Sequence, residues 1–141
     1  MNLDSIDASA LAIPFNAAFK HASAERASTQ TLWVAARARE GAAGFGEGCP
    51  REYVTSESLE GAIAFVRAHV RDWLESIRDL GTLIDWADRH RGEVDANPAA
   101  WTAVELAILD LIGKTEGKPV ESLLGLPQIA GRFRYTAVLG D

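Results

Sequence analysis

Residues 97–126, NPAAWTAVELAILDLIGKTEGKPVESLLGL, constrain the fold more than any other part of this chain. Asn97 can cap a helix, and Pro98 fits its first turn, where a missing N–H costs nothing. The helix is expected to stop in the glycine-rich segment 113–117, and the segment 119–125 forms one further turn opened by its proline. This stretch therefore predicts a long helix followed by a short one.

The long helix is apolar on most of its circumference. Leu106 and Leu109 lie outside its main apolar face, and only the strip near Asp110 and Lys114 is clearly polar. The main face consists of Trp101, Val104, Ile108, Leu111 and Ile112. A helix with this distribution must be covered on more than one side. Other helices can cover one side, and a sheet or an absent domain must cover the other.

Two further helices are expected before it. Over Ser56–Asp79 apolar residues recur at three- and four-residue steps, charged residues such as Glu57 fill the opposite face, and Ser56 is the expected cap. A shorter helix is expected over Thr82–Arg91, and the segment Gly92–Ala96 is expected to be a loop. The inner face of the shorter helix would consist of Leu83, Trp86 and Ala87.

The first fifty residues favour strands. Leu3–Phe15 is a weak strand that stops at its proline, and Phe19–Arg26 is polar and more typical of a loop. Thr29–Glu40 alternates apolar and other residues, which favours a strand. A tight turn over 40–43 then leads into a short returning strand, Gly44–Glu47. These segments predict an antiparallel meander.

Strands first and helices after indicate the α+β class. We expect a three-stranded antiparallel meander followed by a three- to four-helix bundle, forming one domain over residues 1–130. Tyr135–Asp141 has the pattern of a strand with no partner. Residues 131–141 are therefore expected to be a linker and the first strand of a second, missing domain.

Composition excludes several function classes. A net charge of −6 argues against a nucleic-acid binder, and no apolar run approaches the roughly 20 residues that span a bilayer. The acidic N-terminus, MNLDSIDAS, is not typical of a secretory signal. Cys49 is the only cysteine, so no internal disulfide can form, and the cytoplasm is the expected compartment.

No short motif supplies a complete active site. The glycines of residues 44–48 superficially resemble a nucleotide loop, but no helix follows them directly, so a strand with a bend is favoured. His21, His69 and His90 lack metal-ligand spacing, and Cys49 is favoured as an ordinary cysteine over a nucleophile.

Two charged positions on the long helix also have an ordinary structural interpretation. Glu105 lies on an apolar arc, where tying the helix to a neighbouring group is favoured over general-base work. Asp110 and Lys114, four residues apart, are expected to form a surface ion pair. Neither position predicts catalysis.

In order along the chain, several segments resemble the N-terminal capping domain of the enolase superfamily, in its mandelate racemase and muconate lactonizing enzyme branch. Two of these segments are Arg51–Thr55 and Gly117–Gly125. The motif-like pieces are Gly44-Phe-Gly-Glu-Gly-Cys-Pro50, similar to G-x-G-E-x-x-P, and Ala103–Lys114, similar to A-x-E-x-A-x-x-D-x-x-G-K. A departure is Ser56, where related sequences tend to show glycine, a change with no evident cost.

This resemblance implies a lid over the mouth of a missing (β/α) barrel domain, whose carboxylates hold Mg²⁺ and whose basic residue abstracts a proton alpha to a carboxylate. The lid would contribute no catalytic residue and no metal ligand. Two of its loops would contact a small carboxylate substrate, unless their residues are merely solvated. The residues implied are Phe19, Lys20, His21, Arg51 and Tyr53.

Two functions therefore stand side by side. One is a substrate-gating domain of a Mg²⁺-dependent racemase, epimerase or cycloisomerase, inactive without its barrel. The other is a non-catalytic interaction module that self-associates through the surface a barrel would cover, since an unpaired strand edge recruits other chains. A homo-oligomer is expected, and neither nucleic acid nor membrane is an expected partner.

Overall fold

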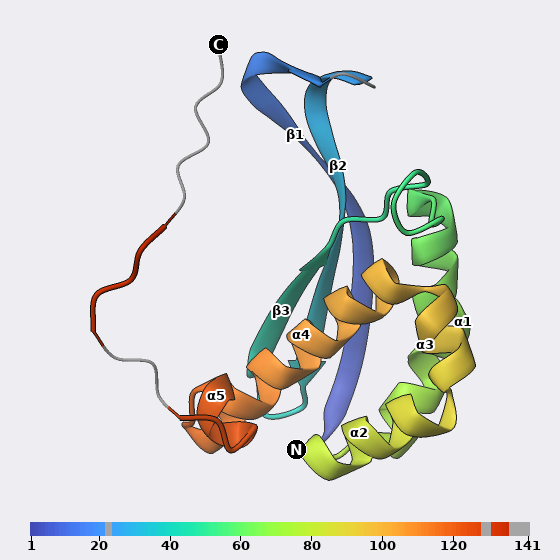
Figure 1. The fold of residues 1–141 in the computed structure, drawn as a ribbon. Coiled ribbons are helices and arrows are strands. Elements are labelled where there is room, and N and C mark those ends of the chain that lie inside the picture. Colours follow the sequence, from blue (N-terminus) through green and yellow to red (C-terminus); the bar gives the residue numbers. More distant parts are fainter. Residues whose placement is uncertain (22–23, 128–130, 136–141) are drawn as a thin grey trace.

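The computed structural model describes residues 1–21, 24–127 and 131–135. A three-stranded antiparallel sheet in the order β1-β2-β3 comes first and helices follow, so the α+β class is confirmed (Figure 1). α4 packs against β3 and β2, and α1 packs against β1. The elements are β1 (Leu3–His21), β2 (Ala24–Ala38), β3 (Ala43–Gly48), α1 (Leu59–Ser76), α2 (Leu80–Arg89), α3 (Arg91–Ala96), α4 (Pro98–Glu116) and α5 (Val120–Leu123).

The β1–β2 hairpin is longer than expected. The prediction of a loop over Phe19–Arg26 is wrong, because Phe19 pairs with Arg26 and Lys20 with Glu25. The strand also continues past Pro14, with a register shift between Pro14 and Phe19. Proline is tolerated there because β1 is an edge strand. This part of the hairpin extends beyond the helices, so no burial pattern marks it in the sequence (Figure 1).

The predicted turn and returning strand are confirmed. Gly41 has a φ of +93°, and the N–H of Ala38 donates to the carbonyl of Ala42 at 2.9 Å, which closes the turn before β3. Trp33 of β2 and Phe45 of β3 then stack with ring centroids 5.6 Å apart.

The glycines of β3 are the contact points for α4. A methyl group added to Gly44, Gly46 or Gly48 would overlap a backbone carbonyl of the helix. Two strand residues advance about 6.6 Å and four helix residues about 6 Å, so alternate strand positions meet successive helix turns. We call this contact the glycine–alanine joint. The helix residues that it involves are Ala99, Ala103 and Ala107.

α4 is buried on two sides, as its sequence requires. Its predicted main face is fully or nearly fully buried, and Leu109 outside that face is also buried. Leu106 remains 45% exposed. The sheet covers one side of α4, and α1, α2 and α3 contact another. Gly117, with a φ of +65°, ends the helix as predicted.

Three helix boundaries differ from expectation. The cap of α1 is Ser58, whose Oγ accepts from the N–H of Gly61 at 3.0 Å, while Ser56 has a φ of +60°. α2 begins two residues earlier than expected, because the Asp79 side chain accepts from the N–H of Thr82 at 2.8 Å in a capping box. The prediction of a loop over Gly92–Ala96 is wrong, since these residues belong to α3.

Aromatic side chains fill the space between the helices. The rings of Trp73, Trp86 and Trp101 lie 5.0–6.1 Å apart between centroids. The indole N–H of Trp86 donates to Asp72 at 2.6 Å. At the rim, His69 Nε2 lies 2.9 Å from a carboxylate oxygen of Glu93, which fastens α3 to α1.

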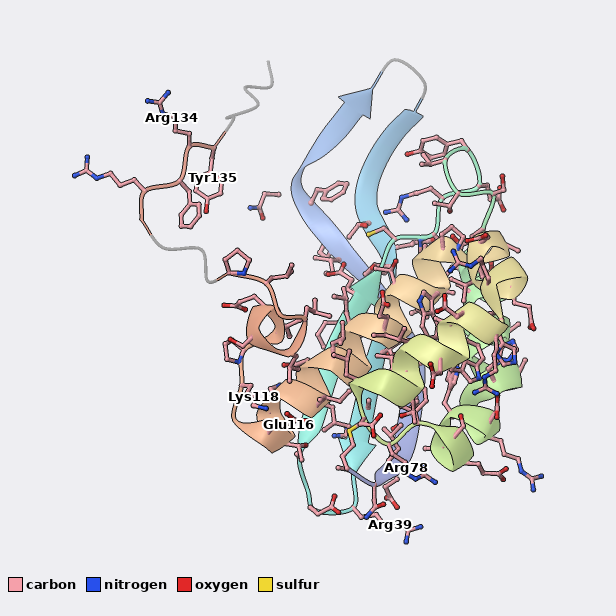
Figure 2. The ribbon with its side chains drawn as sticks, turned by 60° about the horizontal axis from the view of Figure 1, so that its bottom comes forward. Arg39, Arg78, Glu116, Lys118, Arg134 and Tyr135 are labelled. Carbon is pink, nitrogen blue, oxygen red and sulfur yellow. The ribbon has the colours of Figure 1, made fainter. Side chains whose placement is uncertain are left out.

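The end of α1 is held by hydrogen bonds, whereas the segment 131–135 lies away from the rest of the fold (Figure 2). Arg78 lies just beyond α1 and donates to the carbonyls of Leu74, Glu75 and Ile77 at 2.8–2.9 Å, which satisfies the end of that helix (Figure 2). Arg134 and Tyr135 lie apart from the sheet and the helices (Figure 2). Tyr135 is in no strand, and the rest of the predicted strand, residues 136–141, lies outside the described residues. The domain boundary stays a prediction.

Candidate functional site

A hollow of about 500 Å³ opens between β2 and the segment that joins β3 to α1. That segment, residues 49–58, is called the 49–58 loop below. Two of the predicted substrate contacts, Arg51 and Tyr53, line the hollow. Gln30, Glu52, Glu57 and Glu60 also line it.

The other three predicted contacts lie further along the β1–β2 hairpin. The backbones of Phe19, Lys20 and His21 form the last residues of β1. Their side chains lie outside what the structure describes, so the substrate contact assigned to them remains a prediction.

Arg51 holds the 49–58 loop against β2. Its Nη1 donates to the carbonyls of Gln30 and Pro50, both at 2.7 Å, and its Nη2 donates to Thr29 Oγ1 at 3.0 Å. A guanidinium places its donors in a fixed plane, so these bonds fix the side chain's orientation. The cation predicted to face the substrate is thus also a structural link to the sheet.

Glu57 holds the other end of the loop. This residue is only 5% exposed, and its carboxylate accepts from the N–H groups of Ala99 at 2.8 Å and Ala100 at 2.9 Å. The predicted capping residue of α4, Asn97, occupies the N-cap position but makes no side-chain capping bond. The sequence placed Glu57 on a solvated helix face. No local signal could have revealed its role, because its partners lie more than forty residues away.

Acidic side chains dominate the remaining charge at the hollow. Glu52 and Glu60 are exposed, and Tyr53 is 70% exposed at the tip of the loop. Two exposed carboxylates beside one hydrogen-bonded guanidinium give the hollow a negative balance. Such a surface attracts a ligand that carries a positive group.

The charged pair predicted on α4 makes contacts with the sheet. Asp110 and Lys114 form the predicted ion pair at 2.7 Å. Asp110 also accepts from the N–H of Phe45 at 2.9 Å, and Lys114 donates to the carbonyl of Ala43 at 3.0 Å. The pair therefore fastens the free edge of β3 to α4.

Glu105 and Cys49 show no catalytic arrangement. Burial raises the pKa of Glu105, while a hydrogen bond from Trp101 acts in the opposite direction. Cys49 is exposed, with its Sγ 3.7 Å from Thr31 Oγ1. Within residues 1–21, 24–127 and 131–135, no cluster of three or more His, Cys, Asp or Glu side chains is placed to hold a metal ion.

Helices packed on one three-stranded meander, with a loop-lined hollow beside the sheet, define an α+β domain. Residues 6–125 match the model of the mandelate racemase / muconate lactonizing enzyme N-terminal domain. The chain belongs to this family, and the resemblance inferred from its motifs is confirmed.

Several similar proteins are dipeptide epimerases. The chain is 33% identical over 94 residues to the L-Lys-D/L-Arg epimerase of Methylococcus capsulatus, covering 67% of this chain and 26% of that protein. The dipeptide epimerase structure from Methylococcus capsulatus, complexed with Mg and L-Arg-D-Lys, matches 89% of this chain and 35% of that one, with 28% identity and a TM-score of 0.75. A dipeptide epimerase from Enterococcus faecalis, complexed with Mg and L-Leu-L-Tyr, matches 88% of this chain and 34% of that one, with 26% identity and a TM-score of 0.67.

The chain thus spans about a quarter to a third of the length of these relatives. Among the described helices, none combines the length and apolar character needed to cross a bilayer.

Proposed function

We propose that this chain is the substrate-gating capping domain of a Mg²⁺-dependent epimerase-type enzyme of the enolase superfamily, and that it does not catalyse alone. The observation that carries the proposal is the hollow between β2 and the 49–58 loop in a chain of this family. A barrel domain would supply the catalytic base. It would also hold Mg²⁺, the ion bound in the two dipeptide epimerase structures named above. We expect the protein in the cytoplasm, as its single cysteine suggests.

The proposed substrate is a dipeptide, the class named for the relatives. Its carboxylate would lie toward the barrel, and its side chain would face the hollow lined by Arg51 and Tyr53. Phe19, Lys20 and His21 would approach from the hairpin. The exposed carboxylates of Glu52 and Glu60 favour a dipeptide with a basic residue over one with an acidic residue.

The test uses purified 1–141 with Mg²⁺ and a set of dipeptides, with and without the separately expressed barrel domain of the Methylococcus capsulatus relative. We expect no epimerisation by the chain alone and measurable epimerisation when the barrel is added. Turnover by the pure chain would overturn the proposal, and a barrel that gains nothing from the chain would count equally against it.

A second function rests on exposed apolar side chains. Leu106 on α4 and Leu126 after α5 are 45% and 55% exposed, and Phe45 on β3 is 41% exposed. Surfaces of this kind pair with other copies or other domains. Self-association through them is the alternative, and sedimentation separates the two: a monomer at high protein concentration would rule out the interaction module.

A further inference from the structure

We propose that Glu57 is a positioning residue, which holds the 49–58 loop in a fixed place by binding the N-terminus of α4. The role of the loop as a substrate contact rests on the proposed function above. The anchoring itself can be tested without any substrate, so the two ideas can fail separately.

The first observation is the pair of hydrogen bonds that Glu57 accepts. Both of its carboxylate oxygens are used, one by the N–H of Ala99 and the other by the N–H of Ala100. These N–H groups belong to the first turn of α4, where no earlier residue of the helix can accept them. A carboxylate also complements the positive end of the helix dipole. The side chain is buried, so water cannot easily replace it.

The second observation is that the loop tip has little packing of its own. Val54 is 69% exposed, so burial of its side chain contributes little to the order of the tip. Order comes from short polar contacts: the N–H groups of Val54 and Thr55 donate to the carbonyl of Arg51 at 2.9 and 2.7 Å. The guanidinium of Arg51 ties this turn to β2, and Glu57 ties its far end to α4.

The third observation is the backbone at Ser56, between the turn and the second anchor. Its φ of +60° lies in the left-handed region, which residues other than glycine rarely adopt. Such a conformation persists when the surroundings enforce it. Glu57, the next residue, provides that enforcement, so the loss of its two bonds should release the whole turn.

The experiment measures amide hydrogen exchange by NMR in the chain and in the variants Glu57→Ala and Glu57→Gln. The reporters are the amides of Val54 and Thr55 in the turn and of Ala99 and Ala100 at the anchor. Two hydrogen bonds to a charged group are lost in Glu57→Ala, so we expect exchange at these amides to rise about tenfold to a hundredfold. Glutamine retains one acceptor oxygen, so Glu57→Gln should show a smaller increase. The exchange rates at these amides should therefore rise from the parent to Glu57→Gln to Glu57→Ala. If Glu57→Ala does not fold, the parent is compared with Glu57→Gln alone, and faster exchange at the reporter amides of Glu57→Gln is the expected result.

The matched control is Ile108→Val, which removes one methylene from the buried face of α4 far from the loop in sequence. It lowers global stability without touching the anchor, so the turn amides should keep their parental exchange rates. The proposal is overturned if the Glu57 variants leave the turn amides at parental rates. It is also overturned if Ile108→Val accelerates them as much as the Glu57 variants do, because the loop would then open only with the whole domain.

Discussion

The glycine–alanine joint and the 49–58 loop are neighbours in sequence, yet they attach to α4 by opposite means. In the joint, β3 has glycines, which carry no side chain, so the backbones of β3 and α4 come into contact. The loop depends on the side chain of Glu57, which accepts from backbone N–H groups of α4, while Arg51 holds the other end of the loop to β2. The first attachment is made by close packing and the second by directed hydrogen bonds.

Ala99 takes part in both attachments. Its carbonyl oxygen lies against Gly48 at the end of β3, and its N–H donates to Glu57 at the end of the loop. The joint therefore sets the distance between sheet and helix, and the same helix turn then fixes the loop. The loop therefore has a base that is fixed to the helix and a tip that is exposed.

The largest expected effect tests the joint. Gly46→Ala places a methyl group against the carbonyl of Ala103, which is backbone and cannot rotate away. We expect the free energy of unfolding to fall by about 3 kcal/mol, at the upper end of the usual range for overpacking. Urea unfolding followed by tryptophan fluorescence measures it.

The control for this change is Gly92→Ala in α3, where an added methyl group meets nothing within 4 Å. Alanine favours a helix, so this variant should gain up to about 1 kcal/mol. Equal urea midpoints for the two variants would show that β3 and α4 are not in close contact.

The second effect tests the loop's anchor through global stability. Glu57→Ala leaves two buried N–H groups without their acceptor, and we expect a loss of about 2 kcal/mol in urea unfolding. Glu75→Ala removes an exposed carboxylate of α1 that pairs with Arg71 at 2.9 Å. This control should change stability by less than about 0.5 kcal/mol. A loss in Glu57→Ala no greater than in Glu75→Ala would mean that the anchor contributes nothing.

The third effect is a gain. Ser56→Gly removes the side chain from a residue with a φ of +60°, and glycine adopts that conformation without steric cost. We expect stability to rise by about 0.5 to 1 kcal/mol, because the relief exceeds the extra freedom of glycine in the unfolded chain. Ser56→Ala keeps the Cβ atom and should gain nothing. Equal midpoints for the glycine and alanine variants would place the strain elsewhere.

The same positions show what a sequence can and cannot predict. The inner parts of the strands, the long helix and its end at Gly117 are predictable, because periodic burial and a helix-ending glycine leave local patterns. The outer part of the β1–β2 hairpin is not predictable in this way. The serine at position 56 has no evident cost in the sequence, since no pattern reports a backbone angle. Glu57 looked like a solvated helical residue, because its partners are distant in sequence. The family's glycine and alanine motifs were visible separately. That they are two sides of one contact required the structure.

The smallest expected effect concerns Glu105. This carboxylate lies on α4 itself and is half-buried, whereas Glu57 lies in the 49–58 loop and binds the first turn of α4. Burial raises its pKa above the usual value for a glutamate, and the hydrogen bond from Trp101 only partly opposes this. Above the folded pKa, the Glu105 carboxylate is charged in both states. In the native state this charge is half-buried, whereas in the unfolded chain it is in water, so the native state is destabilised. As the pH falls through the raised folded pKa, the native protein takes up its proton first and stability increases.

Glu105→Gln is neutral at every pH and should be more stable than the parent at pH 7, by less than about 0.5 kcal/mol because a half-exposed group is screened by solvent. The difference should shrink as the pH falls toward the unfolded value of about 4.3. Urea midpoints of the two proteins at pH 7 and pH 5 measure it. A difference that grows on acidification would mean that the charged form of Glu105 is stabilised in the fold. Contacts of the folded protein would then outweigh the cost of burying the Glu105 carboxylate.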